Sequence, residues 1–358
     1  MRKIIQSSSR HAGFSVVEMM IGLAIGMVAI IVMMQVFSAS EGYKRTTTGG
    51  NDAQNNGAIA LYALQRDIRQ SGLGASAFPL IGCNVTLRAG VTLNSISPVT
   101  INHASIPAAD AGDTLLVVYG NGPGSSEGEQ VEAKPSLTTY TIAAAAAGAS
   151  SPGAFVVGDR VVAQFQARPS PCNLSMEAVT AVAGTAVSVA TGVANSGGTL
   201  YNLGQAPKVM VYAVRGGNLT VCDYIANDCS AVGSVANAAI WVPIASNVVS
   251  LRAEYGWDTS APMDATVDTY ALSTPTALAA ATTQCLWARR SALRFALVAR
   301  SSELDKASVT ASAPTWAGGA SAPIDLSADA SWQRFRYKTF QTVVPLRNMA
   351  WQGVQAGC

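Results

Sequence analysis

The stretch from Phe14 to Met34 constrains this chain more than any other part of its sequence. It runs for 21 residues with a single charged side chain, that of Glu18. As a helix it would be roughly 31 Å long, and the hydrocarbon core of a bilayer is about 30 Å thick. The sequence therefore predicts one membrane-spanning helix close to the N-terminus.

The charges beside this stretch predict its orientation. Arg2, Lys3 and Arg10 precede it, and no acidic residue accompanies them. Because positively charged flanks stay in the cytoplasm, residues 1–13 are expected on the cytoplasmic side of the inner membrane. The chain after Met34 is expected on the other side, in the periplasm or beyond. No small-residue cleavage site of the secretory type follows Met34, so we expect the helix to remain part of the protein.

Glu18 is the unusual residue of the apolar stretch. A carboxylate inside a membrane helix is unfavourable by up to about 3 kcal/mol, less near the helix end, so this side chain requires a partner. Cleavage between Gly13 and Phe14 would create an α-amino group four residues before Glu18. That amine would neutralise the carboxylate, either within one chain or between neighbouring chains.

Residues 13–18, with the sequence GFSVVE, resemble the type III signal of type IV prepilins. The resemblance implies that a prepilin peptidase cleaves after Gly13 and methylates the new N-terminus at Phe14. It also implies that Glu18 pairs with the N-terminal amine of an adjacent subunit and so sets the register of the subunit in a filament. The alternative is a plain single-pass anchor with an incidental glutamate.

An amphipathic helix is predicted to follow the membrane segment and to end near residue 71. Its apolar face has spacings of three and four residues, at Ala58, Leu61, Leu64 and Ile68. Its polar face carries Arg66, Asp67, Arg69 and Gln70. Two adjacent glycines within residues 46–50 are each about 1 kcal/mol less favourable in a helix than alanine, which predicts a bend or local melting there.

From residue 80 onward, short apolar runs alternate with Gly, Pro, Asn and Ser, which is typical of strands and turns. Strands are expected at 114–119, 155–166, 208–214, 219–224, 247–256, 292–300 and 334–346. Residues 215–218, with the sequence RGGN, are expected to form a hairpin turn.

The chain is thus predicted to be an α+β protein, with a long N-terminal helix and a β-rich globular domain built on antiparallel sheet. The expected division is a leader peptide at 1–13, a transmembrane part at 14–34, an amphipathic periplasmic part at 35–72 and a globular domain at 80–358.

Three segments near the C-terminus, 251–258, 292–301 and 342–348, resemble the pattern of PilW-type minor pilins, as does the helix segment 60–72. The resemblance implies a low-abundance pilin that acts with other minor pilins and the major pilin to start pilus assembly, and that sits near the pilus tip. A PilY-type adhesin is a further implied partner. The alternatives are a J-type minor pseudopilin of a type II secretion system, which shares the N-terminal signal, and a tip adhesin whose residues 80–240 bind a surface or DNA.

All six cysteines follow the membrane segment, which agrees with export to an oxidising compartment. Six cysteines allow fifteen pairings. Six residues separate Cys222 from Cys229, which favours a local disulfide. Cys358 resembles the C-terminal clamp of many pilins, and Cys285 is its preferred partner. No Cys-x-x-Cys pair indicates a zinc site.

Charge and histidine content argue against other functions. Without residues 1–13 the chain has 23 − 3 = 20 basic against 21 acidic residues, too little positive charge for a nucleic-acid binder. His11 and His103 are the two histidines, so neither catalysis nor a cofactor is expected, and His103 is expected to be structural. Asp258, Asp264 and Asp268 would suit calcium, although loop aspartates more often organise turns, and no metal is expected.

Overall fold

The computed structural model describes residues 13–122, 124–125, 127–143, 155–193, 197–275, 281–350, 353–355 and 357–358 of the chain. It contains two compact units, Met1–Asn51 and Asp52–Cys358. The leader predicted at residues 1–13 lies outside the described residues except for Gly13.

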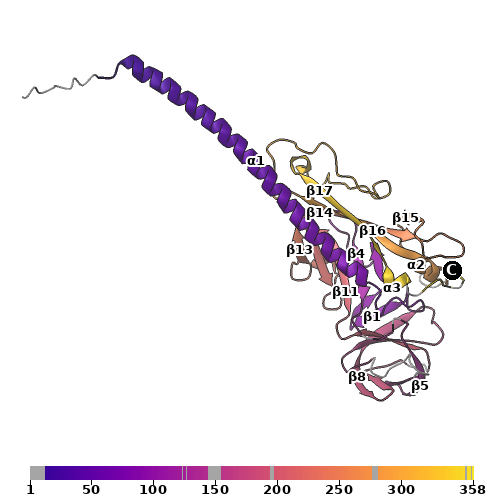
Figure 1. Ribbon diagram of the computed structural model, residues 1–358. Helices are drawn as coiled ribbons and strands as arrows, with labels where there is room; N and C mark the ends of the chain where they lie inside the picture. Colours follow the sequence, from indigo (N-terminus) through magenta and orange to yellow (C-terminus); the bar gives the residue numbers. More distant parts are fainter. Residues whose placement is uncertain are drawn as a thin grey trace, which may run out of the picture. The chain divides into compact units, whose positions relative to one another are not determined.

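Helix α1, Val16–Gln70, begins in the first unit (Figure 1). Among the described residues it is the one helix that is long and apolar enough to cross a membrane. The melting expected at residues 46–50 is wrong, because the helix continues through them. There the hydroxyl groups of Thr46 and Thr47 donate hydrogen bonds of 3.0 Å to the carbonyl oxygens of Gly42 and Tyr43, four residues earlier.

Among its described residues, the second unit contains the end of α1, three sheets, two short α-helices and two single-turn 3-10 helices, Val232–Ser234 and Trp332–Arg334. A five-stranded sheet has the order β13-β12-β11-β4-β3, a four-stranded sheet the order β15-β14-β16-β17, and the remaining strands form a larger sheet. The strands are β1 Asn84–Arg88, β2 Val91–Leu93, β3 Val99–Ile101, β4 Leu115–Tyr119, β5 Glu129–Ser136, β6 Thr139–Ile142, β7 Arg160–Gln164, β8 Asn173–Ala183, β9 Ala186–Val189, β10 Thr199–Gly204, β11 Lys208–Arg215, β12 Asn218–Asp223, β13 Val242–Ser246, β14 Val248–Trp257, β15 Thr269–Ala271, β16 Arg290–Arg300 and β17 Tyr337–Pro345, and the helices are α2 Ala281–Ala288 and α3 Arg347–Ala350.

The predicted α+β class, with a long N-terminal helix and antiparallel sheets, is confirmed. Each of the seven expected stretches contains a strand, and the expected hairpin joins β11 to β12, with both central glycines at positive φ. The strand expected at 155–166 is longer than the strand found there, β7. Phe155 instead packs into a core ahead of β7, and Gly158, at φ +94°, turns the chain before the strand begins.

Six strands of the large sheet close into a barrel. Their order is β8-β7-β10-β5-β6-β9, and β9 pairs back onto β8, so that each of the six has an antiparallel neighbour on both sides. The interior is filled by Val, Ile, Leu, Tyr and Phe side chains. The barrel is inserted between β4 and β11, which pair directly with each other. The barrel strands lie between residues 129 and 204, where the sequence predicts strands and turns but not their arrangement.

The last turns of α1 are buried against the two smaller sheets. Ala60, Leu64 and Ile68 are fully buried and share a core with residues of β4, β11, β14 and β16. The predicted helix faces are wrong at two positions, since Ala58 is exposed and Asp67 is buried. A charged side chain enters this core because it finds partners there.

Asp67 is held by two groups. One carboxylate oxygen accepts a short hydrogen bond from the Tyr212 hydroxyl on β11, and the other lies 2.8 Å from the Arg66 guanidinium. Burial, followed by the Asp67 carboxylate, raises the pKa of Tyr212, which therefore remains a donor at neutral pH. This buried pair fixes α1 to β11 at one position.

Gly57 allows the closest approach between α1 and the four-stranded sheet. A Cβ atom at Gly57 would lie 2.0 Å from Cε2 of Phe340 on β17, so the aromatic ring rests directly on the helix backbone. Any side chain at this position displaces the ring.

We expect Gly57→Ala to lower the free energy of unfolding by about 1–2 kcal/mol, because the added methyl group overlaps the Phe340 ring. Helix propensity alone predicts the opposite sign, a gain of about 1 kcal/mol. Denaturation of the purified chain in detergent measures the effect. Gly50→Ala is the matched control, since a Cβ there meets no atom within 4 Å. Equal effects of the two substitutions would contradict the steric explanation.

Candidate functional site

The expected cleavage point lies just ahead of α1. Gly13 and Phe14 belong to no helix or strand, and the Phe14 side chain is 83% exposed. The peptide bond between them is therefore free of regular backbone hydrogen bonding. This geometry is compatible with a protease substrate.

Glu18 takes part in a capping arrangement at the start of α1. The backbone N–H of Ser15 donates to a Glu18 carboxylate oxygen at 3.0 Å, and the N–H of Val17 donates to the Ser15 hydroxyl at 3.2 Å. Serine followed three residues later by glutamate is the sequence pattern of a capping box. In a single chain the Glu18 carboxylate thus caps the N-terminus of α1, where a negative charge is favourable.

The structure pairs the six cysteines into three disulfides. Cys222 bonds to Cys229 and Cys285 bonds to Cys358. The third disulfide joins Cys83, just after α1, to Cys172, just ahead of β8 in the barrel. No local pattern indicates this last pairing, because 89 positions separate the two residues, although they are the two cysteines that the other pairings leave.

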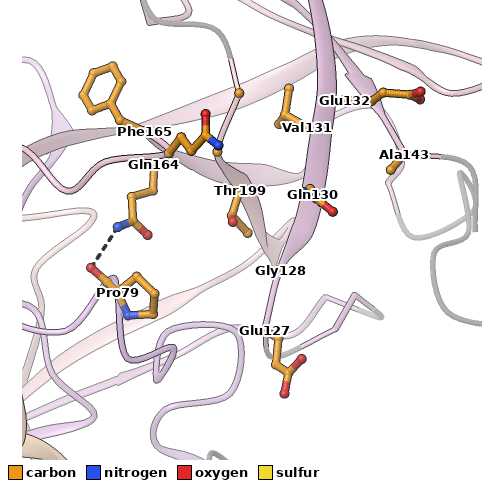
Figure 2. A pocket seen from close by; sticks show the side chains of 13 residues that line it. Pro79, Glu127, Gly128, Gln130, Val131, Glu132, Ala143, Gln164, Phe165 and Thr199 are labelled. Carbon is orange, nitrogen blue, oxygen red and sulfur yellow. Dashed lines mark hydrogen bonds between the residues drawn. The ribbon is translucent and has the colours of Figure 1, made fainter. Parts of the chain in front are cut away.

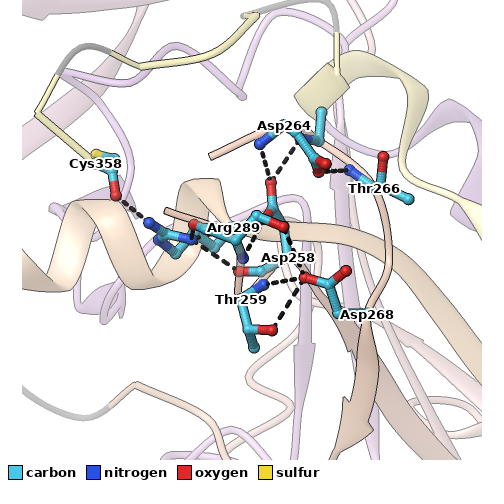
Figure 3. A network of polar contacts seen from close by, with 9 residues as sticks. Asp258, Thr259, Asp264, Thr266, Asp268, Arg289 and Cys358 are labelled. Carbon is cyan, nitrogen blue, oxygen red and sulfur yellow. Dashed lines mark hydrogen bonds and ion pairs between the residues drawn. The ribbon is translucent and has the colours of Figure 1, made fainter. Parts of the chain in front are cut away.

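The three loop aspartates act as hydrogen-bond acceptors within their own loop (Figure 3). Asp258 is fully buried and accepts from the backbone N–H groups of residues 260, 264 and 265. Asp268 accepts from the backbone N–H and hydroxyl of Thr259, which lowers the pKa of its carboxyl group. Among the described residues, no group of three His, Cys, Asp or Glu side chains is arranged to hold a metal ion.

Arg289 connects this loop to the C-terminal residue. Its guanidinium lies 3.7 Å from the Asp258 carboxylate and donates to the carbonyl oxygens of Asp258 and Ser260. It also donates to the carbonyl oxygen of Cys358 (Figure 3). Together with the Cys285–Cys358 disulfide, this contact fixes the C-terminus on the loop that follows β14.

A buried cation lies beside this region. The Arg290 guanidinium lies within 4.5 Å of the ring centroids of Tyr255, Trp257 and Trp287, and donates to two backbone carbonyl oxygens. Burial lowers the pKa of Arg290 to about 10, so the group stays charged at neutral pH. Aromatic faces attract a cation, which explains how the charge is accommodated here.

The C-terminal end of α1 is capped from a distant part of the chain. The Asn348 amide donates to the carbonyl oxygens of Gln70 at 3.2 Å and Ser71 at 2.8 Å. The N–H of Gly72 donates to the carbonyl oxygen of Val118 on β4 at 2.7 Å. Carbonyl groups in the last turn of a helix lack partners within it, and Asn348 supplies one. Asn348 belongs to the segment 342–348, whose sequence resembles the PilW pattern, but the sequence does not predict that its side chain caps α1.

His103 is buried in a structural position. Its Nε2–H donates to the carbonyl oxygen of Asn94 at 2.6 Å, and its Nδ1 accepts from the N–H of Ser105 at 3.2 Å. The second contact requires the neutral ring, because a protonated Nδ1 cannot accept a hydrogen bond. Burial lowers the pKa of His103, which works in the same direction.

Residues 224–348 match the family model described as Type IV Pilus-assembly protein W. A solved structure that resembles the chain is a type IV-like pilin from Thermus thermophilus, which is 11% identical. That match covers 83% of this chain and 96% of the other, with a TM-score of 0.31, too low to carry an argument. No match was found among curated proteins.

The residues that match this family model extend from just after β12 to just after β17 and include β13 to β17. They contain the segments 251–258, 292–301 and 342–348, whose pattern resembles the PilW family, and the predicted resemblance is confirmed. The C-terminal part of the chain is therefore similar to a family of type IV pilus assembly, and α1 is long and apolar enough to cross a membrane.

We expect the stability of the domain to fall as the pH drops from 7 to 5.5. Because the pKa of His103 is lowered on folding, the unfolded chain binds the proton more readily, and protonation below about pH 6.5 favours unfolding. The slope is at most about 1.4 kcal/mol per pH unit for one group. Urea denaturation at several pH values measures it, and His103→Gln is expected to flatten the curve in this window. An unchanged curve in the variant would contradict the assignment.

We expect Asn348→Asp to lower the free energy of unfolding by about 1–2 kcal/mol, because the helix-end carbonyl groups lose their donor. The new carboxylate also adds a negative charge at the helix C-terminus, where it is unfavourable. Asn55→Asp, at an exposed position of the same helix, is the matched control and is expected to change stability by less than about 0.5 kcal/mol. Equal thermal midpoints for the two variants would show that the cap contributes nothing.

Proposed function

We propose that this chain is a minor type IV pilin of the PilW type, which takes part in initiating pilus assembly and is incorporated near the pilus tip. The observation that carries the proposal is the match of residues 224–348 to the pilus-assembly family. The prepilin-like sequence at residues 13–18 and the apolar start of α1 support it from the other end of the chain. No catalytic role is proposed.

The proposal divides the chain by its fate during assembly. Residues 1–13 are a leader that prepilin peptidase removes between Gly13 and Phe14, and Phe14 then carries the methylated N-terminus. Residues 14–34 anchor the subunit in the lipid of the inner membrane, residues 35–72 continue as the periplasmic helix, and residues 80–358 form the globular domain in the periplasm. The exposure of Gly13 and Phe14 supports access to the cleaved bond.

The membrane part of α1 is also proposed to pack against the helices of other subunits in the filament. Its apolar side chains are exposed in a single subunit. Lipid covers them before assembly and the helices of other minor pilins and the major pilin cover them afterwards, so the hydrophobic effect favours both states. A PilY-type adhesin at the tip is a further proposed partner.

Glu18 is proposed to select the register of the subunit. In a single chain its carboxylate accepts the N–H of Ser15. In the filament the α-amino group of a neighbouring Phe14 would take the place of this weaker partner, because a buried carboxylate is stabilised most by an opposite charge. Subunits in other registers would leave both charges unpaired.

A J-type minor pseudopilin of a type II secretion system is the second candidate, since it would share the signal and the helix. The description of the matched family names the pilus, which favours the pilus over the pseudopilus.

We expect Glu18→Ala to leave cleavage intact but to lower incorporation into filaments at least about tenfold, because the neighbouring amine loses its partner. Mass spectrometry of the N-terminal peptide from sheared filaments and from membranes of the same cells measures both quantities. Ser15→Ala is the matched control, since it removes the capping hydroxyl and keeps the carboxylate.

Methylated Phe14 in the filament fraction, at low stoichiometry, is the result expected of a minor pilin. Processed protein confined to membranes would favour the pseudopilin. An intact Met1 in cells that make pili, or normal incorporation of the Glu18 variant, would contradict the proposal. Replacing Gly13 by a bulky residue is expected to block processing and serves as the unprocessed reference.

A further inference from the structure

We propose that the barrel binds an uncharged, hydroxyl-rich ligand, a mono- or oligosaccharide, in a cavity at its rim (Figure 2). The cavity has a volume of about 740 Å³ and lies between the start of β5, the end of β7 and the start of β10. Pro79, from the segment after α1, closes one side. Ligand sites in proteins typically have volumes of about 300–1,000 Å³, so a small saccharide fits.

The charges around the cavity weakly disfavour anionic ligands. Its lining includes the carboxylates of Glu127 and Glu132, and no Lys, Arg or His among the described residues. A phosphate, a nucleic acid or an acidic lipid headgroup would be repelled. Both glutamates are solvent-exposed, so their attraction for a cation is weak and screened by salt. The uncharged polar side chains that line the cavity, rather than the two glutamates, therefore determine which ligand it binds.

Three amide side chains line the cavity. They belong to Gln130 on β5, Gln164 at the end of β7 and Gln166, two residues further along the chain. Gln164 is buried, whereas Gln130 and Gln166 are solvent-exposed at the rim. An amide offers both donors and an acceptor, which matches a sugar hydroxyl that donates and accepts in turn. A purely apolar ligand would cover the exposed Gln130 and Gln166 amides without offering them partners, which is unfavourable.

Gln164 is held in place from both ends. Its Nε2 donates to the carbonyl oxygen of Pro79 at 3.1 Å, and its Oε1 accepts from the Tyr201 hydroxyl at 3.1 Å. The residue is buried, so this part of the wall is fixed before a ligand arrives. A preorganised wall lowers the entropic cost of binding. The partly buried Phe165 adds an aromatic surface against which the C–H face of a sugar ring can pack.

The cavity belongs to the inserted barrel and lies outside residues 224–348, which carry the family match. Saccharide binding is therefore independent of the proposed role in pilus assembly, and the failure of either leaves the other standing. The chemistry is the same for a free sugar and for a surface glycan.

Saturation-transfer NMR on the purified full chain, in a detergent without a sugar headgroup, tests the proposal. The probes are methyl α-mannoside, methyl β-galactoside and N,N′-diacetylchitobiose, with spermidine and inorganic phosphate as the charged comparisons. We expect saturation transfer to at least one saccharide, with an affinity that does not change between about 50 and about 500 mM sodium chloride. Immobilised glycan carrying the same sugar then distinguishes a surface-bound from a free ligand.

Gln130→Leu is expected to weaken saccharide binding at least about tenfold, because a ligand hydroxyl loses its partner. Gln166→Leu, at an exposed position of the rim, is a second variant that does not disturb the core. Thr180→Leu is the matched control, an exposed polar-to-leucine change on β8 of the same barrel and outside the cavity lining, and is expected to bind as the unaltered chain does.

Three results would overturn the proposal. The first is no transfer to any of the three saccharides. The second is equal binding by the unaltered chain and by both glutamine variants with unchanged thermal midpoints. The third is a preference for spermidine that weakens with salt, or for phosphate, which would assign the cavity to a charged ligand.

Discussion

The globular domain depends on the burial of the last turns of α1 between two sheets. Leu64 and Ile68 have no exposed surface, and each contributes roughly 1.5–3 kcal/mol of hydrophobic stabilisation. Small residues on the same face, Gly57 and Ala60, allow the sheet to approach the helix backbone closely. The strands β4, β11, β14 and β16 all contribute to this one core, so their positions follow from where the helix lies.

Buried polar pairs give that packing a unique register. Asp67 on α1 meets Tyr212 on β11, and the fully buried Glu254 on β14 meets Arg294 on β16. Ser321, in the long connection between β16 and β17, donates to the same Glu254 carboxylate. An unpaired charge in such a core is unfavourable by several kcal/mol, so arrangements that separate these partners are excluded. The apolar contacts provide most of the stability. The Asp67–Tyr212 pair selects the alignment of α1 on β11. The Glu254–Arg294 pair lies on the other face of the four-stranded sheet, beside Trp316, and selects the alignment of β14 with β16.

The parts of this fold that could be predicted from the sequence are those encoded over short distances. The apolar run after Phe14, the glycine pair of the β11–β12 hairpin and the longer strands all produce local patterns. Asp67 could not be placed, because a helical period assigns a carboxylate to the solvent face and says nothing of a tyrosine 145 residues later. The cap from Asn348 was missed for the same reason, whereas the pairing of Cys83 with Cys172 was left open but follows once the other two disulfides are assigned. The cleavage motif is a linear signal, whereas the glutamines of the barrel cavity come from strands that only the closed barrel brings together.

The Cys83–Cys172 disulfide links the start of β8 in the barrel covalently to the segment that precedes β1. By sequence, the barrel is reached from the helix only through β1 to β4 and the segments between them, but the disulfide joins the root of β8 to a residue shortly after the end of α1. A pull on the barrel is therefore transmitted to the helix through the short segment from Ser71 to Cys83 and one sulfur–sulfur bond. The strands on the longer route are then spared from bearing the load. In the proposed role as a fibre subunit, tension on the barrel would thus reach α1 without first unfolding β1 to β4.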